Sequence, residues 1–526
     1  MDEETKDVHR EKAETKHKTK PAGFLIHINA AVIIILALYF FVIPFFMMIY
    51  FLSDPALKTS QPGRFAYWLH RCLSPKYQHW AYDRVSTGKA ESMHIEDISG
   101  TEWPMFGSVF YLLGTEYLEQ GLKDSNNNSA VPPSNYAAGA IEAATDLIVD
   151  ERHAAWVKMH WGEDYRHREN IFYRMLLISG TTSYENLLGG GKHIELLRDQ
   201  VETLSTELNE SRFGLLDDYP GQCFPTDVIA ALAAIKRADQ VLGTDHNDFL
   251  DRSLRGFERN LVDPVTLMPP YMADKTCACP GDSRGCSGQW GVRWAAYLWP
   301  ETAKNWYESF DKHFWQRRFG FAGFREFREA KDQKNWYFDV DSGPVVGGFG
   351  AAASAFGLGA ARANGRFDHA YPLAVEAIVI SWPLPDGTLL LPRFLSNMSD
   401  APYLGECAIL FNIAQPTAPA FQPAGTSDIP GIVYIALLLY ILMPLILIIS
   451  SIQKLKRWRK YRDRAKVPVV KSQAAAWIVF FAVGLVCIFF GLLFHGLIFI
   501  LLCQLLPLGI KFPKQQVVPK QPQDEK

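Results

Sequence analysis

Three long apolar runs dominate the hydrophobic pattern of the chain. They extend from Phe24 to Leu52, from Ile432 to Ile452 and from Ala474 to Ile510, and they are almost free of charged residues. A helix needs roughly 20 apolar residues to cross the hydrocarbon core of a bilayer. The pattern therefore predicts transmembrane helices over 24–52 and 431–452 and a transmembrane segment over 474–510.

The length of the first and last runs adds detail to this prediction. As one helix, the last run would measure about 55 Å, which exceeds one crossing. We expect one long span here, and two spans joined by a tight turn near 491–496 are the alternative. The first run is too long for the apolar core of a signal peptide and no small-residue cleavage site follows it, so we interpret it as a retained anchor.

Basic residues next to the spans predict the orientation. The tail 1–20 is rich in Lys and Arg, and the loop 453–471 contains a dense basic cluster from Lys454 to Arg464. Such segments remain in the cytoplasm. The protein is therefore predicted to be integral to the lipid bilayer, with its main domain on the non-cytoplasmic side. The polar tails 1–20 and 511–526 are predicted to be disordered.

Apolar residues recur at helical spacing between the first two spans, as in Val228, Ile229, Leu232 and Ile235. Strand-like alternation is scarce, so 101–428 is predicted to be an all-α domain and 53–100 a linker. Helices are predicted over 103–121, 133–150, 167–187, 191–209, 225–242, 246–261, 288–299, 301–316, 343–364, 368–381 and 401–414.

The loops of this domain alternate in character. Loops such as 189–192 and 243–245 are short, whereas those before every second helix are long and rich in polar and aromatic residues, as in 161–168 and 216–227. Hairpins with alternating connections favour an (α/α)6 toroid whose long loops gather on one face. A plain helical bundle or a solenoid is the alternative. The predicted fold class is thus all-α, an (α/α)6 toroid domain carried by transmembrane helices.

The segment Asp339–Pro344 precedes the helix predicted over 343–364. Pro344 would occupy the first helical turn, and Asp341 or Ser342 would cap its free N–H groups. Two carboxylates on a loop at a helix start make this segment the centre of the predicted site.

The other long loops also carry carboxylates and aromatic rings, which typically line a carbohydrate site. Glycoside hydrolysis needs one protonated acid and one carboxylate, and crowded carboxylates shift each other's pKa. We predict Asp341 and Asp218 as acid and base, supported by Asp227 and Glu406. The predicted substrate-binding residues are Asp339, Glu102, Trp103, Tyr165, Tyr219, Arg284, Glu326, Asp400 and Tyr403.

A structural role is the alternative for each of these acids. Asp227 is placed to cap a helix. Asp339 and Asp341 could pair with arginines, and Glu326 and Glu406 could each belong to an ion pair.

The helical rhythm and the loop acids resemble the six-hairpin toroid enzymes, which include glycoside hydrolases, sugar epimerases and linalool dehydratase/isomerase. Two segments carry the last resemblance, Glu169-Asn170-Ile171-Phe172-Tyr173 and Asp218-Tyr219-Pro220-Gly221-Gln222-Cys223-Phe224-Pro225-Thr226-Asp227. The resemblance implies that Cys223 is a functional cysteine and that Tyr173 belongs to the pocket. This chain departs from the family's pattern at Thr226-Asp227, near where a second cysteine would stand.

Charge and cysteine spacing narrow the choice of partners. The net charge of −3 is close to neutral, and no basic patch indicates a nucleic acid as the main partner. The stretch 347–350 lacks the preceding strand and the Lys-Ser/Thr of a phosphate loop. The spacing of Cys277, Cys279 and Cys286 fits zinc poorly and favours a disulfide or free thiols. No metal and no cofactor are predicted.

Three functions follow from these observations. The first is a membrane-anchored toroid enzyme that acts on a glycan or glycoconjugate by carboxylate acid/base catalysis. The second is a dehydratase or isomerase of a terpenoid or lipid alcohol that uses Cys223, for which a pocket lined by apolar side chains would speak. The third is a membrane subunit without activity that binds a glycan or a protein, for which acids paired with arginines would speak.

Overall fold

The computed structural model describes residues 23–24, 26–94, 97–125, 130–276, 279–331, 336–339, 342–397, 399–461, 470–489, 496, 498–500 and 502. The chain divides into two compact units, one of Met1–Phe45 with Leu438–Lys526 and one of Phe46–Leu437. Asp341, Cys277 and both predicted tails lie outside the described residues.

Two described helices are long and apolar enough to cross a membrane, Ile26–Leu52 and Gly431–Lys460. The first contains η1 (Leu38–Val42) and α2 (Ile43–Leu52), and the second belongs to α18 (Gly431–Tyr461). They coincide with the first two predicted spans. A signal sequence and a buried core helix meet the same length and composition criteria, and neither helix reveals its orientation.

The third apolar run folds back on itself. Helix α19 covers Lys471–Phe489, and the Phe480 ring lies 5.9 Å from the Phe499 ring. A Cβ at Gly484 would stand 2.9 Å from the carbonyl oxygen of Gly496. One straight helix would separate Phe480 from Phe499 by about 28 Å, so these two residues do not belong to one straight helix, and the number of spans stays a prediction.

The larger unit is mostly helical, as predicted. Its helices are η2 (Pro55–Lys58), α3 (Arg64–Ser86), η3 (Lys89–Ser92), α4 (Ile98–Asp124), α5 (Pro133–Tyr136), α6 (Ala138–Val149), α7 (Ala155–Trp161), η4 (Tyr165–His167), α8 (Ile171–Leu187), α9 (Ile194–Glu210), α10 (Pro225–Leu242), α11 (Asn247–Asn260), α12 (Gly285–Leu298), α13 (Pro300–Phe314), α14 (Ala351–Ala363), α15 (Phe367–Ile380), α16 (Leu390–Ser396) and α17 (Leu404–Ala414).

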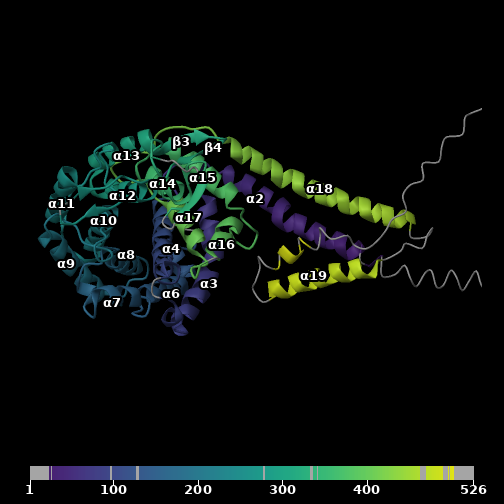
Figure 1. Ribbon diagram of the computed structural model, residues 1–526, viewed down its shortest axis with the longest axis horizontal. Coiled ribbons are helices and arrows are strands. Elements are labelled where there is room, and N and C mark those ends of the chain that lie inside the picture. The colour runs from purple at the N-terminus through teal and green to yellow at the C-terminus, as the bar shows by residue number, and fades with distance from the viewer. Residues whose placement is uncertain are drawn as a thin grey trace, which may run out of the picture. The chain divides into compact units, whose positions relative to one another are not determined.

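Six of these helices pack as a closed series of neighbours. Helix α4 packs against α8, α8 against α10, α10 against α12, α12 against α14, α14 against α17, and α17 against α4 again. The other long helices flank this series, α9 beside α8, α13 beside α12, and α15 beside α14. Figure 1 shows α9, α11 and α13 outside α8, α10 and α12.

Three small antiparallel sheets interrupt the helices, so the prediction of an all-α domain is only partly right. They pair β1 (Ala273–Asp274) with β2 (Cys279–Pro280), β3 (Trp315–Arg318) with β4 (Phe321–Phe324), and β6 (Gly343–Val346) with both β5 (Trp336–Asp339) and β7 (Phe349–Gly350).

The segment that the sequence places at a helix start is part of the third sheet. Pro344 lies in β6 opposite Phe338, and α14 begins only at Ala351, so the prediction that Pro344 opens a helix is wrong. Gly343 at φ +67° and Gly347 at φ +61° explain this difference. Glycine adopts these left-handed conformations at little steric cost, and they form the turns on both sides of β6.

The range 53–100 is not an extended linker, because it contains α3. Phe65, Leu69, Leu73 and Tyr77 are buried at four-residue spacing along this helix, which packs against α6 and α17. The domain therefore begins before residue 101.

Candidate active site

Asp218 is a buried carboxylate where the loop before α10 meets the start of α8. Its oxygens accept hydrogen bonds from the backbone N–H of Phe172 at 2.7 Å and of Phe224 at 3.3 Å. Burial raises the pKa of Asp218 well above its usual value, and the charge of Asp227 raises it further. The two N–H groups oppose this effect. Burial and the neighbouring charges therefore favour the protonated form of Asp218.

Three predicted site residues surround this acid. Glu102 on α4 and Asp227 on α10 both lie close enough to raise the pKa of Asp218 electrostatically. Cys223 is buried, and burial, together with Asp218, raises the pKa of its thiol. The thiol is therefore neutral, which disfavours a thiolate nucleophile at this position. Asp227 lies in the first turn of α10, whose N-cap residue Phe224 forms no side-chain cap, so the structural alternative for Asp227 stays open.

The adjacent Asp217 has a different environment. Its carboxylate forms an ion pair with Lys275 at 2.9 Å, and Lys275 also contacts Glu169. The Glu169 carboxylate in turn accepts a hydrogen bond from the Asp217 N–H at 2.7 Å. These contacts fix the loop that presents Asp218.

Two residues in left-handed conformations complete this arrangement. Glu169 and Asn170 have φ values of +50° and +59°, and the Asn170 N–H donates to the Asp217 carbonyl oxygen at 2.7 Å. Non-glycine residues rarely adopt such values, and strained backbone of this kind clusters at functional sites.

Four aromatic side chains cluster beside the Asp218 loop. The rings of Tyr165 and Tyr173 lie 5.8 Å apart, Tyr173 lies 6.4 Å from Trp156, and Trp156 lies 5.8 Å from Tyr219. The structure thus brings together three of the four predicted tyrosines and adds Trp156. Tyr165 and Tyr173 are buried, whereas Tyr219 is half-buried.

Aromatic rings also converge from the six-helix series. Phe106 of α4 lies 5.3 Å from the Phe172 ring of α8 and 5.6 Å from Trp290 of α12, and Trp290 lies 5.5 Å from Phe356 of α14. Phe106, Phe172 and Phe356 are half-buried, whereas Trp290 between them is buried. Because the Phe172 N–H binds Asp218, this apolar surface adjoins the acid.

The prediction from sequence missed this surface, although a signal was present. Glu102, Phe106 and Phe110 follow one another at four-residue intervals along α4, and Trp290 and Trp294 do the same along α12. This spacing places side chains on one helix face.

Several other predicted site acids are neutralised by arginines. Arg284 forms ion pairs with Glu326 at 2.9 Å and with Asp339 at 3.0 Å. Burial raises the pKa of Glu326 to about 7 despite Arg284. Glu406 is fully buried and pairs with Arg393 at 2.8 Å. These contacts favour the structural alternative for Glu326, Asp339 and Glu406.

The remaining predicted residues fall away from Asp218 or outside the described part. Asp400 pairs with Lys89 at 3.6 Å, and Tyr403 stacks on Arg393 at 4.0 Å. Trp103 is half-buried on α4. Asp341, the predicted partner of Asp218, lies outside the described residues, and so does Cys277, which leaves the disulfide of the cysteine cluster a prediction.

Among the described residues, no group of three or more His, Cys, Asp or Glu could hold a metal ion.

No protein-family model matches the chain, and a search of curated proteins finds no match.

Proposed function

We propose that the larger unit is an (α/α)6 toroid enzyme that dehydrates, hydrates or isomerises a small, largely apolar alcohol or alkene. The closed series α4, α8, α10, α12, α14 and α17, flanked by outer helices, supports the toroid. The observation that carries the activity is the position of Asp218, a carboxyl group with a raised pKa beside an aromatic surface.

The chemistry follows from these groups. Asp218 donates its proton to the substrate hydroxyl, and the C–O bond breaks to release water. The rings of Phe106, Phe172 and Trp290 stabilise the positive charge that develops on carbon. Asp227 then accepts a proton from the adjacent carbon and an alkene forms. Hydration is the reverse sequence, and isomerisation combines both directions.

The partial resemblance to linalool dehydratase/isomerase supports this choice of substrate class. An apolar substrate also suits a chain with two long apolar helices, because it would partition into the bilayer. We place these helices in the membrane and the domain on its non-cytoplasmic side, since Lys454–Lys460 form a basic end of α18.

The glycan hypothesis from the sequence is the second candidate. It is favoured by the proximity of Asp218, Asp227 and Glu102, because hydrolysis also needs an acid beside a carboxylate. The arginine partners of Glu326, Asp339 and Glu406 leave fewer acids for sugar hydroxyls, and the apolar rings fit an alcohol better.

The decisive experiment compares substrates and variants of the full chain in detergent. Short-chain allylic alcohols and alkenes are incubated in D2O, and deuterium in recovered alkenes and alcohols is measured by mass spectrometry, beside a panel of labelled glycans. We expect Asp218→Asn to lower turnover of an alcohol at least about 100-fold, the usual effect of losing a general acid.

The matched control is Asp199→Asn, which changes an exposed carboxylate that pairs with His167 and accepts a hydrogen bond from Gln200. It should leave turnover unchanged. Hydrolysis of a glycan without conversion of any alcohol would select the second candidate. Full activity of Asp218→Asn would overturn both.

A further inference from the structure

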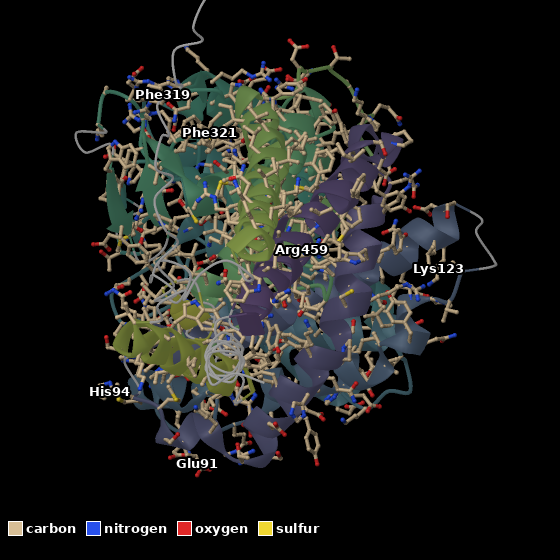
Figure 2. The ribbon with its side chains drawn as sticks, turned by 90° about the vertical axis from the view of Figure 1, so that its right-hand side faces the viewer. Glu91, His94, Lys123, Phe319, Phe321 and Arg459 are labelled. Carbon is tan, nitrogen blue, oxygen red and sulfur yellow. The ribbon has the colours of Figure 1, made fainter. Side chains whose placement is uncertain are left out.

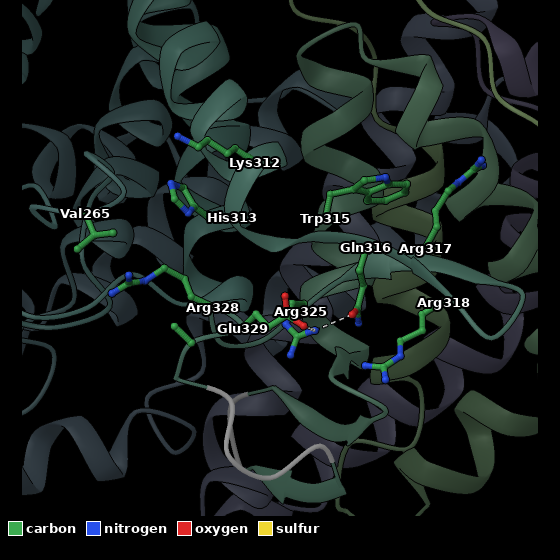
Figure 3. A pocket seen from close by; sticks show the side chains of 11 residues that line it. Val265, Lys312, His313, Trp315, Gln316, Arg317, Arg318, Arg325, Arg328 and Glu329 are labelled. Atoms are coloured by element: carbon green, nitrogen blue, oxygen red, sulfur yellow. Dashed lines mark hydrogen bonds and ion pairs between the residues drawn. The ribbon is translucent and has the colours of Figure 1, made fainter.

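A basic pocket lies between α13 and the β3–β4 hairpin. It has a volume of about 610 Å3. Lys312, Arg317, Arg318, Arg325 and Arg328 line it together with His313, whereas Glu329 is the single carboxylate in its lining. Figure 3 shows Arg328 and Arg325 along one side, with Lys312 and His313 facing them.

Few acids offset this charge. Arg328 lies 3.2 Å from Asp282 and 3.9 Å from Asp263, and Arg325 donates to the Gln316 amide oxygen at 2.7 Å. Arg317 donates hydrogen bonds to Ser427 and to the Asp428 carbonyl oxygen, and its charge also acts on the buried Glu376. Among the described residues no acid forms an ion pair with Lys312, Arg317 or Arg318.

Two buried donors in the lining have no hydrogen-bond partner among the residues that the structure describes. They are Nε of Arg328 and Nε2 of Gln316. The side chain of Arg328 is 12% exposed and that of Arg325 is 7% exposed, so both guanidinium groups are held in place. Fixed guanidinium groups suit the paired oxygens of a phosphate, which they bind in bidentate fashion.

The pocket also adjoins the start of an apolar helix. The Gly320 carbonyl oxygen, at the tip of the β3–β4 hairpin, accepts a hydrogen bond from Ile432 of α18 at 3.0 Å. The same hairpin exposes Phe319, which is 70% accessible, and nearby β5 exposes Trp336 and Phe338 at 72% and 71%. Figure 2 shows Phe319 and Phe321 at one end of the domain, with Glu91 and His94 at the other.

We propose that this pocket binds a phosphate group and that an anionic phospholipid supplies it. The β3–β4 hairpin contacts the first turn of α18 and exposes the Phe319 ring, which fits the interfacial region of a bilayer at the level of the headgroups. The inference goes beyond the catalytic proposal and rests on the membrane placement of α18, not on any turnover.

The test uses the full chain in detergent and measures binding with short-chain phosphatidic acid, short-chain phosphatidylcholine and inorganic pyrophosphate. The variant Lys312→Gln/Arg318→Gln removes two cations that have no acidic partner. Lys304→Gln is the matched control, because it removes an exposed cation from the same helix outside the pocket. We expect phosphatidic acid to bind, the double variant to bind it about tenfold more weakly, and the control to bind as wild type.

The outcomes separate the sources of the phosphate. If phosphatidic acid binds more tightly than both phosphatidylcholine and pyrophosphate, the result supports an anionic lipid headgroup as the ligand. If pyrophosphate binds as well as phosphatidic acid, the phosphate site is supported but the lipid is overturned as the source of the phosphate. Absence of binding to all three, or equal binding by the double variant, overturns the site. The Asp218→Asn protein should still bind phosphatidic acid, so the lipid site can be tested separately from the catalytic proposal.

Discussion

Two adjacent carboxylates in this protein have opposite roles because their neighbours differ. Asp217 has Lys275 beside it and stabilises a loop, whereas Asp218 has two N–H groups and two further carboxylates. Removing a neighbouring charge should therefore change the pKa of Asp218 more than the position of its side chain.

The pH dependence of activity tests this view of Asp218. In the proposed reaction Asp218 acts in its protonated form, so the rate should be lost as the pH rises through its raised pKa. Asp227→Asn removes the charge that helps to raise this pKa, and we expect the alkaline limb of the pH–rate profile to move to lower pH. Residual turnover suffices for the measurement. An unmoved limb would show that Asp227 does not act on Asp218.

Glu376 allows a separate test of buried charge by stability. It is buried on α15, accepts a hydrogen bond from the Ala322 N–H at 2.8 Å, and burial raises its pKa to about 8. The folded state then binds more protons than the unfolded state between the ordinary carboxyl pKa and about 8, so stability falls as the pH rises through this window.

The variant Glu376→Gln keeps an oxygen acceptor for Ala322 but cannot ionise. At pH 9 the variant should unfold at a higher temperature than wild type, and its free energy of unfolding should be larger by on the order of 2 kcal/mol. Near pH 4 this stability difference between variant and wild type should vanish. Thermal denaturation followed by circular dichroism in detergent measures both. Equal shifts at the two pH values would contradict the titration of Glu376.

At the scale of elements, the backbone at the start of α12 lies very close to the backbone of the residues that directly follow β4. A Cβ at Gly285 would stand 2.0 Å from the Arg325 carbonyl oxygen, and the Gly285 N–H donates to the Glu326 carbonyl oxygen at 2.7 Å. Gly285→Ala would therefore push the strand away, and we expect a loss of about 1–3 kcal/mol in unfolding free energy.

Gly256 in α11 provides the control for this substitution. The nearest atom to its Cβ would be 3.7 Å away, which is ordinary contact. Gly256→Ala should raise stability by about 0.5–1 kcal/mol, because alanine favours the helix. Chemical denaturation of both variants decides the point, and similar effects of the two would contradict the crowding at Gly285.

Element periodicity explains how much of the fold was predictable. Helix α10 was predicted at its observed bounds, because its apolar spacing and Pro225 act locally. The strand β6 was not, because its pairing with β5 and β7 depends on partners rather than on its own sequence. The ion pairs between arginines and the predicted site acids were unpredictable for the same reason. Arg284 and Glu326 are 42 positions apart, and only the fold brings them together.

At the scale of the whole molecule, the acids predicted for one cavity separate into distinct groups. Asp218, Asp227, Glu102 and Cys223 come together, whereas Glu406 pairs on α16 and α17. The long loops indicated which helix ends carry polar chemistry, whereas the aromatic rings of α4, α8, α12 and α14 meet only in the fold, and our proposal of an apolar substrate rests on them.

The orientation of the domain can be tested through its own sequence. Asn127-Asn128-Ser129, Asn209-Glu210-Ser211 and Asn397-Met398-Ser399 match the acceptor pattern for N-glycosylation, and all lie in the region predicted to be outside the cytoplasm. Asn209 is exposed at the end of α9. Glycosylation enzymes act only on the lumenal side of the endoplasmic reticulum, so these sites report topology.

Translation of the full chain with microsomes should therefore give products of higher mass that a glycosidase returns to the unmodified size. Asn209→Gln should remove one glycan, whereas Asn247→Gln, an exposed position outside the acceptor pattern, should leave the mass unchanged. Resistance to alkaline extraction establishes insertion separately. An inserted chain with no glycan on any acceptor would contradict the predicted side, because Lys454–Lys460 would then lie on the lumenal side despite their charge.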